Sequence, residues 1–263
     1  MGQDKIGIVK SILSSMGEVL IAYSGGVDST LLLKIAKEVL GDKVLAVTAR
    51  SETYPEEEIE AAVELAKSLG VKHQIIETKE LEDERFISNP SERCYFCKQE
   101  LFSNLIKMAN GSFVLDGAHF DDLKDHRPGK NAAEELGVRS PLQEAKLTKE
   151  EIRAVSRELN LPTWNKPSLA CLASRFPYGM RLTRENLKKV AEAERYLKSL
   201  GLKQVRVRHH SDSARIEVPK ENIPLLFKKH KEIIGKLKNL GYTYITVDLE
   251  GYRSGSMNEV LRR

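Results

Sequence analysis

Short apolar runs alternate with amphipathic stretches through the first half of this chain. Four runs have the length of buried strands: residues 19–23, 44–48, 73–76 and 113–115. Apolar residues at helical spacing follow the first run and end at Gly41, and a second helix is predicted from Pro55 to Leu69. Strands separated by helices of this length predict a Rossmann-like parallel sheet with helices on both faces and right-handed crossovers.

The pattern changes in the last third of the chain. A helix is predicted from Thr148 to Leu159, and three prolines then interrupt the region up to Met180. We place a domain boundary there, which divides the chain into residues 1–175 and a smaller α+β domain, residues 176–263. The second domain is predicted to form helices and strands in this order: helix 183–200, strands 204–209 and 214–218, helix 223–240 and strand 242–248.

The six residues SGGVDS directly follow the first predicted strand. A strand that enters a helix through a glycine turn presents backbone N–H groups and the positive end of the helix dipole to an anion. Gly25 and Gly26 allow close backbone approach, and Ser24 and Ser29 supply hydroxyl groups. Asp28 is unusual beside phosphates, and its carboxylate suits a magnesium ion. The predicted ligand is therefore a magnesium-bound polyphosphate.

This loop lacks the Gly-Lys-Ser/Thr ending of a Walker A motif. It resembles the pyrophosphate loop of the PP-loop ATP pyrophosphatases instead. That resemblance implies a PP-loop fold, binding of ATP with Mg²⁺, and cleavage between the α and β phosphates. An ordinary glycine-rich turn between a strand and a helix is the alternative interpretation.

Composition and charge narrow the class of protein. The 263 residues are 41% hydrophobic and 30% charged, which is typical of a globular protein with a proper core. No apolar stretch approaches the roughly 20 residues of a membrane span, so we expect a cytoplasmic protein that does not bind membranes. The net charge of +4 is uneven: residues 176–263 carry 19 basic and 10 acidic residues. This bias favours an anionic partner, although a solvated basic surface explains it equally well.

Three cysteines lie in polar motifs. Cys94 and Cys97 form a C-x-x-C pair, and Cys171 lies far along the chain. Such a pair is compatible with redox chemistry, half a zinc site, an iron–sulfur anchor or two buried small side chains. Three thiolates can hold three corners of a 4Fe–4S cluster and leave one iron open. A structural zinc would need a fourth ligand, and nothing singles one out.

Taken together, seven motifs resemble the LarE family over nearly the whole chain. They are SGGVDS, RCYFCK (93–98), Asp116-Gly117 with Asp121-Asp122, DHRPG (125–129), RSPL (139–142), PSLACLASR (167–175) and RVRH (206–209). The resemblance implies an ATP-dependent sulfur transferase that converts the two carboxylates of pyridinium-3,5-biscarboxylic acid mononucleotide to thiocarboxylates. This product belongs to the synthesis of the nickel-pincer cofactor of lactate racemase. Other nickel-cofactor biosynthesis proteins as partners, and a homo-oligomer, are implied as well.

The resemblance leaves two sources of sulfur. In one branch of the family, the cysteine matching Cys171 gives up its own sulfur and becomes dehydroalanine. In the other branch, three cysteines bind a 4Fe–4S cluster that carries an extra sulfide. Because Cys94 and Cys97 are both present, the cluster branch is favoured.

Several further residues are candidates for the site. Gly117 follows the fourth strand and is assigned to the nucleotide site with the SGGVDS loop. Arg127 and Arg175 are candidates to grip phosphate or carboxylate groups, and Arg175 is grouped with Asp28 and Cys171 as catalytic because it lies four residues from Cys171.

Arg206 and Arg208 share one face of a predicted strand and are candidates for the substrate phosphate. Glu194 and Glu217 are further candidates for binding a metal ion. Asp121 and Asp122 are interpreted either as cation or adenosine ligands or as helix caps.

Three other functions compete with sulfur transfer to a small nucleotide. A tRNA thiolation enzyme also uses a pyrophosphate loop and paired cysteines, but the modest charge and the 6% aromatic content argue against a nucleic-acid platform. An amide-forming synthetase of the NAD or GMP type leaves the cysteines unexplained. A nucleotide-sensing module would bind ATP without releasing pyrophosphate.

Overall fold

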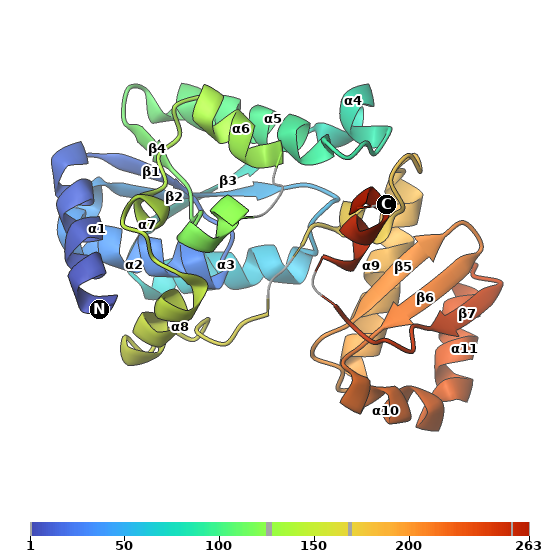
Figure 1. Cartoon of the computed structure of the whole chain (residues 1–263). Helices are drawn as coiled ribbons and strands as arrows, with labels where there is room; N and C mark the ends of the chain where they lie inside the picture. Colours follow the sequence, from blue (N-terminus) through green and yellow to red (C-terminus); the bar gives the residue numbers. More distant parts are fainter. Residues whose placement is uncertain (1, 125–127, 168–169, 254, 263) are drawn as a thin grey trace. The chain divides into compact units, whose positions relative to one another are not determined.

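The chain folds as two compact units. Residues 2–124, 128–167, 170–253 and 255–262 are described in a computed structural model (Figure 1). Unit 1 comprises Met1–Phe86 and Ser91–Leu169, and unit 2 comprises Ile87–Pro90 and Ala170–Arg263. The sequence pattern did not indicate that Ile87–Pro90 belongs to unit 2. Backbone hydrogen bonds from Leu182 to Ile87 and from Gly179 to Asn89 hold it there.

Unit 1 is a parallel α/β sheet, as predicted. Its elements are α1 (Gly2–Met16), β1 (Val19–Ala22), α2 (Val27–Leu40), β2 (Val44–Arg50), α3 (Glu56–Ser68), β3 (Lys72–Glu77), α4 (Glu84–Ile87, of which the last residue belongs to unit 2), α5 (Arg93–Ala109), β4 (Phe113–Leu115), α6 (Pro128–Glu135), α7 (Pro141–Glu144) and α8 (Lys149–Glu158). The strand order is β3-β2-β1-β4, and every pair is parallel. Because β1 is central, its carboxyl end lies where ligands bind in such sheets.

Alternation along the strands of unit 1 produces a core on each face of the sheet. Val19 and Ile21 of β1 pack with residues of α1, α2 and α3, whereas Leu20 packs with α5 and α6. Figure 1 shows α2 and α3 on one face and α5 and α6 on the other. Both faces of the sheet are therefore covered, which explains why its strands read as continuous apolar runs.

Unit 2 is a three-stranded sheet with helices. Its elements are α9 (Arg184–Ser199), β5 (Arg206–His210), β6 (Ser213–Glu217), α10 (Ile223–Lys228), α11 (His230–Asn239) and β7 (Tyr244–Val247). β5 pairs with β6 in antiparallel fashion, and β6 pairs with β7 in parallel. One face of the sheet, including Val207 and Ile216, forms a core with α9 and α11. The opposite face of β5 and β6 carries charged residues.

One predicted helix of unit 2 is wrong. The single helix expected over residues 223–240 is two helices, α10 and α11, which are separated at Lys229. The His230 imidazole lies 2.8 Å from the carbonyl oxygen of Phe227 at this break. A side chain that bonds a helical carbonyl competes with the backbone ladder, and apolar spacing alone cannot reveal this. In the part of the chain that the structure describes, no helix has the length and apolar character that crossing a membrane requires.

Candidate functional site

The SGGVDS loop joins β1 to α2 and is shaped by its glycines. Gly25 has φ of +65°, and a Cβ atom there would lie 2.9 Å from the Cβ of Ala62 on α3. The Ser24 and Ser29 hydroxyls lie 3.1 Å apart across the loop. Only glycine allows this backbone conformation without strain while packing so closely on α3. The result is a loop whose two hydroxyl groups meet at the first turn of α2.

Gly117 brings a second segment against the same helix end. A Cβ atom at Gly117 would lie 2.9 Å from the backbone nitrogen of Ser29. The preceding Asp116 accepts hydrogen bonds from the hydroxyl of Ser140, at 2.6 Å, and from the Ala118 backbone, at 3.1 Å. The carboxyl ends of β1 and β4 therefore meet around the N-terminus of α2, and the assignment of Gly117 to the nucleotide site stays a prediction.

Two lysines contact the loop, and sequence reasoning missed both. The Lys149 ammonium donates to both Asp28 carboxylate oxygens at 2.6 Å. Lys166 donates to the carbonyl oxygen of Gly25 at 3.0 Å and pairs with Glu58 at 2.9 Å. One signal was present: Lys149 is the first residue of α8, where the helix dipole disfavours a cation that has no anionic partner.

This set of donors fits a nucleotide polyphosphate with a magnesium ion. The first N–H groups of α2, two hydroxyls and two ammonium groups gather at one strand end. The Asp28 carboxylate supplies an oxygen ligand of the kind Mg²⁺ prefers. The geometry therefore supports binding of an anion with its metal, while the individual ligand roles stay predictions.

Asp121 and Asp122 act as helix and turn caps in the structure. Asp121 accepts a 2.8 Å hydrogen bond from the backbone N–H of Lys149, at the start of α8. Asp122 accepts one at 3.0 Å from the backbone N–H of His119. Asp121 thus fixes the residue that reaches Asp28. Arg127 lies outside the described residues, so its predicted role stays a prediction.

Cys94 and Cys97 lie in the first turns of α5. The side chain of Cys94 is exposed and that of Cys97 is partly buried, and neither forms a disulfide. Residues three apart share a helix face, so the two thiols belong to one side of α5. Cys171 belongs to unit 2. Among the described residues, no three His, Cys, Asp or Glu side chains gather as a metal site.

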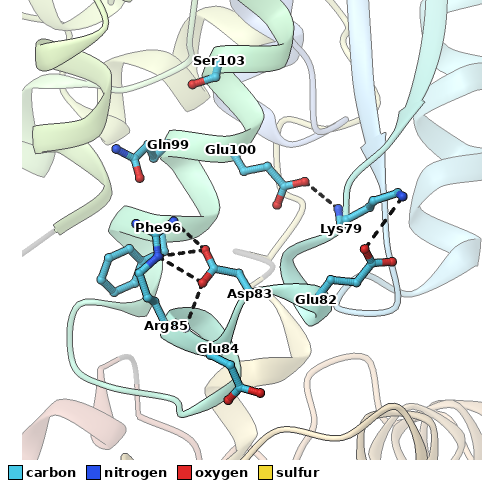
Figure 2. A pocket seen from close by; sticks show the side chains of 9 residues that line it. All are labelled: Lys79, Glu82, Asp83, Glu84, Arg85, Phe96, Gln99, Glu100 and Ser103. Atoms are coloured by element: carbon cyan, nitrogen blue, oxygen red, sulfur yellow. Dashed lines mark hydrogen bonds and ion pairs between the residues drawn. The ribbon is translucent and has the colours of Figure 1, made fainter.

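A cavity of about 580 Å³ lies between α5 and the segment after β3 (Figure 2). Its lining residues are Lys79, Glu82, Asp83, Glu84, Arg85, Phe96, Gln99, Glu100 and Ser103. Burial, aided by neighbouring carboxylates, raises the pKa of Glu100. Four carboxylates against two cations make this pocket unsuitable for a polyphosphate, so it is separate from the nucleotide site.

In unit 2, Arg175 organises the segment that carries Cys171. Arg175 is 2% exposed and donates to the carbonyl oxygens of Ala170 and Cys171, at 2.7 and 3.0 Å. Its other nitrogens make a bidentate pair with Glu194 of α9, at 2.8 and 2.9 Å. Arg175 therefore holds the backbone at Cys171 in position. It is buried, whereas the sequence assignment expected an arginine that is exposed to a ligand.

A second buried pair lies on the charged face of the sheet. Arg208 binds both Glu217 carboxylate oxygens, at 2.9 and 2.7 Å, and also donates to the carbonyl oxygen of Ser174. Glu217 lies opposite Arg206 in the strand register, as the sequence indicated. Arg206 is 5% exposed, and burial together with Arg175 lowers its pKa. This face of the sheet therefore concentrates guanidinium groups, which are well suited to bind anionic oxygens.

The predicted metal ligands Glu194 and Glu217 are held by these arginines. Each carboxylate has both oxygens in hydrogen bonds to a guanidinium group. A nearby cationic Arg175 also keeps the pKa of Glu194 below its usual value, although burial opposes this. A metal ion at either carboxylate would have to displace an arginine, so the pairs explain these residues without a metal.

A parallel sheet with SGGVDS at the carboxyl end of its central strand defines a PP-loop enzyme that uses ATP. The family model described as NAD synthase matches residues 7–95. Pyridinium-3,5-bisthiocarboxylic acid mononucleotide synthase of Lactiplantibacillus plantarum is 44% identical over 255 residues, which cover 95% of this chain and 92% of the relative. The chain belongs to the LarE family.

Two further relatives match along most of their length. An uncharacterized protein of Synechocystis sp. is 44% identical over 268 residues, with both chains covered completely. An uncharacterized protein of Methanocaldococcus jannaschii is 32% identical over 240 residues, which cover 90% of this chain and 91% of the relative. The likeness therefore extends through both units and is not confined to the phosphate loop.

Proposed function

We propose that this protein is an ATP-dependent sulfur transferase that converts the carboxylates of pyridinium-3,5-biscarboxylic acid mononucleotide to thiocarboxylates. The observation that carries this proposal is the 44% identity, across both units, to a synthase of the corresponding bisthiocarboxylic acid mononucleotide. The phosphate loop of unit 1 and the arginines of unit 2 fit the two substrates. Service to a nickel-pincer enzyme such as lactate racemase, other nickel-cofactor biosynthesis proteins as partners, and a homo-oligomer form part of the proposal.

The reaction begins with activation of a carboxylate, because an oxide is a poor leaving group. A carboxylate oxygen attacks the α-phosphorus of ATP, the bond to the bridging oxygen of the β-phosphate breaks, and pyrophosphate leaves. The N–H groups of α2 and the ammonium of Lys149 or Lys166 would stabilise the departing charge. A magnesium ion at Asp28 would supply Lewis-acid neutralisation of the same charge.

The second step replaces AMP by sulfur. A sulfur nucleophile attacks the acyl carbon of the adenylate, and AMP leaves with the bonding electron pair. Product analysis by mass spectrometry, after incubation with MgATP, the dicarboxylate nucleotide and a sulfide source, tests the whole proposal. We expect a mass change of one oxygen replaced by sulfur per carboxylate. An unaltered dicarboxylate in reduced, iron-reconstituted protein would overturn it.

The substrate phosphate is assigned to the arginines of unit 2. The concentration of guanidinium groups on this face supports the role, and Arg206 and Arg208 lie on one face of β5. Replacement of Arg208 with Ala should weaken substrate binding in calorimetry while ATP binding is retained. Because Arg208 also neutralises Glu217, circular dichroism of the variant serves as the folding control. Unchanged substrate affinity would contradict the assignment.

The sulfur is proposed to come from a sulfide on a 4Fe–4S cluster whose thiolates are Cys94, Cys97 and Cys171. The support is the presence of three cysteines with no disulfide. Protein purified without oxygen should contain about four iron and four sulfide ions per chain, the stoichiometry of one cubane cluster. Replacing Cys94 with Ala should abolish iron binding. Absence of iron after anaerobic reconstitution would point to Cys171 as a sacrificial donor, which loses the elements of H₂S.

A further inference from the structure

Lys149 holds Asp28 as a metal ion would. Its ammonium nitrogen lies 2.6 Å from both carboxylate oxygens, so the pair is symmetric and bidentate. The two side chains are 28% and 24% exposed, which screens the attraction only in part. Ammonium and a divalent cation need the same oxygens. Lys149 and a metal ion therefore cannot both occupy this position.

The backbone of Lys149 is fixed by contacts that do not involve its ammonium group. Its N–H is bonded to Asp121, and the preceding Thr148 forms a capping box with Glu151. The Glu151 carboxylate is held further by Lys5, at 2.7 Å. These contacts anchor the first turn of α8 beside the loop. Only the flexible four-carbon stem of Lys149 has to move for its ammonium to change partners.

The other lysine at the loop has a different arrangement. Lys166 is bonded to a backbone carbonyl, that of Gly25, and its charge is neutralised by Glu58 of α3. It therefore leaves the Asp28 carboxylate untouched. Lys149 is accordingly the lysine whose charge becomes available when a metal takes Asp28.

We propose that Lys149 is a cation that exchanges with the metal of the proposed ATP reaction. In the nucleotide-free protein it neutralises Asp28 and excludes a divalent cation from the empty loop. When the metal arrives with its nucleotide, Asp28 binds the metal and the released ammonium binds a phosphate oxygen. Lys149 is thus a phosphate-binding residue whose position is set by the metal. The proposal rests on the proposed ATP chemistry but concerns steps before it.

The exchange predicts opposite effects on two ligands. Lys149→Met should tighten binding of Mn²⁺ alone to the nucleotide-free protein by about tenfold, because a competing ammonium is removed. It should weaken binding of a non-cleavable ATP analogue, with α,β-methylene linkage and Mg²⁺, by a similar factor. Electron paramagnetic resonance measures free Mn²⁺, and calorimetry measures the nucleotide. Adding Asp28→Asn to the variant should abolish the gained Mn²⁺ binding.

Lys37→Met is the matched control, because it removes a Lys–Asp pair, with Asp42, at the other end of α2. It should change neither affinity. Unchanged or weaker Mn²⁺ binding in Lys149→Met would overturn the exchange, since a purely structural lysine would weaken both ligands. Tighter Mn²⁺ with unchanged nucleotide affinity would overturn the transfer to phosphate. If the wild-type protein bound no ATP analogue, the proposed function itself would fail, which is a separate result.

Discussion

The two units build their charged surroundings in different ways. In unit 1, the SGGVDS loop is a continuous stretch of six residues, and it presents the backbone N–H groups at the start of α2 as donors for an anion. In unit 2, the charged groups are long side chains that are buried as pairs, such as Arg175 with Glu194. A contiguous motif can be recognised in the sequence, whereas pairs formed between distant residues cannot.

This difference also affects the energetics of the two units. Backbone donors at an open helix end bond to water or to nearby hydroxyls until a ligand arrives, so they add little cost to the fold. Buried ion pairs carry a desolvation penalty that only a complete pair offsets. We therefore expect substitutions at the charged groups to damage stability in unit 2 and ligand binding in unit 1.

The largest effect is expected at Arg175. Replacement with Ala leaves Glu194 buried without its charge partner, which should lower the free energy of unfolding of unit 2 by about 3–5 kcal/mol. Arg253→Ala, which removes exposed pairs with Glu250 and Glu259 and a longer one, at 3.6 Å, with Asp248, should cost about 1 kcal/mol or less. Urea denaturation measures both. Equal losses in the two variants would remove the distinction between buried and exposed pairs.

A pH effect is expected at His209. This imidazole is 2% exposed and lies 3.2 Å from the Tyr242 hydroxyl, and burial lowers its pKa to about 4. The unfolded chain binds this proton near pH 6.5, so unfolding becomes easier as the pH falls from about 6.5 to about 4. The pKa difference between the folded and unfolded chain limits the loss of unfolding free energy to about 3.4 kcal/mol.

His209→Gln should flatten the pH dependence of the unfolding midpoint in that window. His230→Gln, at an exposed position of α11, should leave the dependence as it is. An unchanged slope in the His209 variant would show that other groups cause it.

A smaller loss of stability is expected at Gly117. In Gly117→Ala, the new Cβ atom would lie 2.9 Å from the Ser29 backbone nitrogen, so one of the two segments has to shift. This shift should lower the free energy of unfolding by about 1–3 kcal/mol. Nucleotide affinity should fall with it, since the shift displaces the first turn of α2. Gly7→Ala on α1 meets nothing within 4 Å and should stabilise the helix by up to about 1 kcal/mol. Retained affinity in Gly117→Ala would separate Gly117 from the nucleotide site.

The smallest effects are expected at two helix caps, one in each unit. Thr148 accepts a hydrogen bond from the Glu151 backbone, and Thr183 accepts one from that of Asn186. Each Thr→Ala substitution should lower the free energy of unfolding, measured by thermal denaturation, by about 1 kcal/mol. Similar losses would show that local signals act equally in both units. If the loss of stability were several times larger in one unit, the difference between the two units would extend beyond their charged groups.

The sequence predicted the sheet of unit 1 well because its strands are buried on both faces and its loop motif is local. Glu217 was expected beside Arg206 because strand alternation places such residues together. The roles of Lys149 and Lys166 were not predicted, because they reach Asp28 and Gly25 from far along the chain. Alternation indicated a shared face for the arginines of β5 but could not reveal their buried pairing.

The most direct test is to identify the nucleotide products formed from MgATP. Phosphorus NMR of the reduced, iron-reconstituted protein with pyridinium-3,5-biscarboxylic acid mononucleotide distinguishes pyrophosphate from orthophosphate. Pyrophosphate should form only when the dicarboxylate is present, and Asp28→Asn should abolish it. Release of ADP with orthophosphate, or no cleavage of ATP by a protein that binds both substrates, would contradict adenylation at the SGGVDS loop.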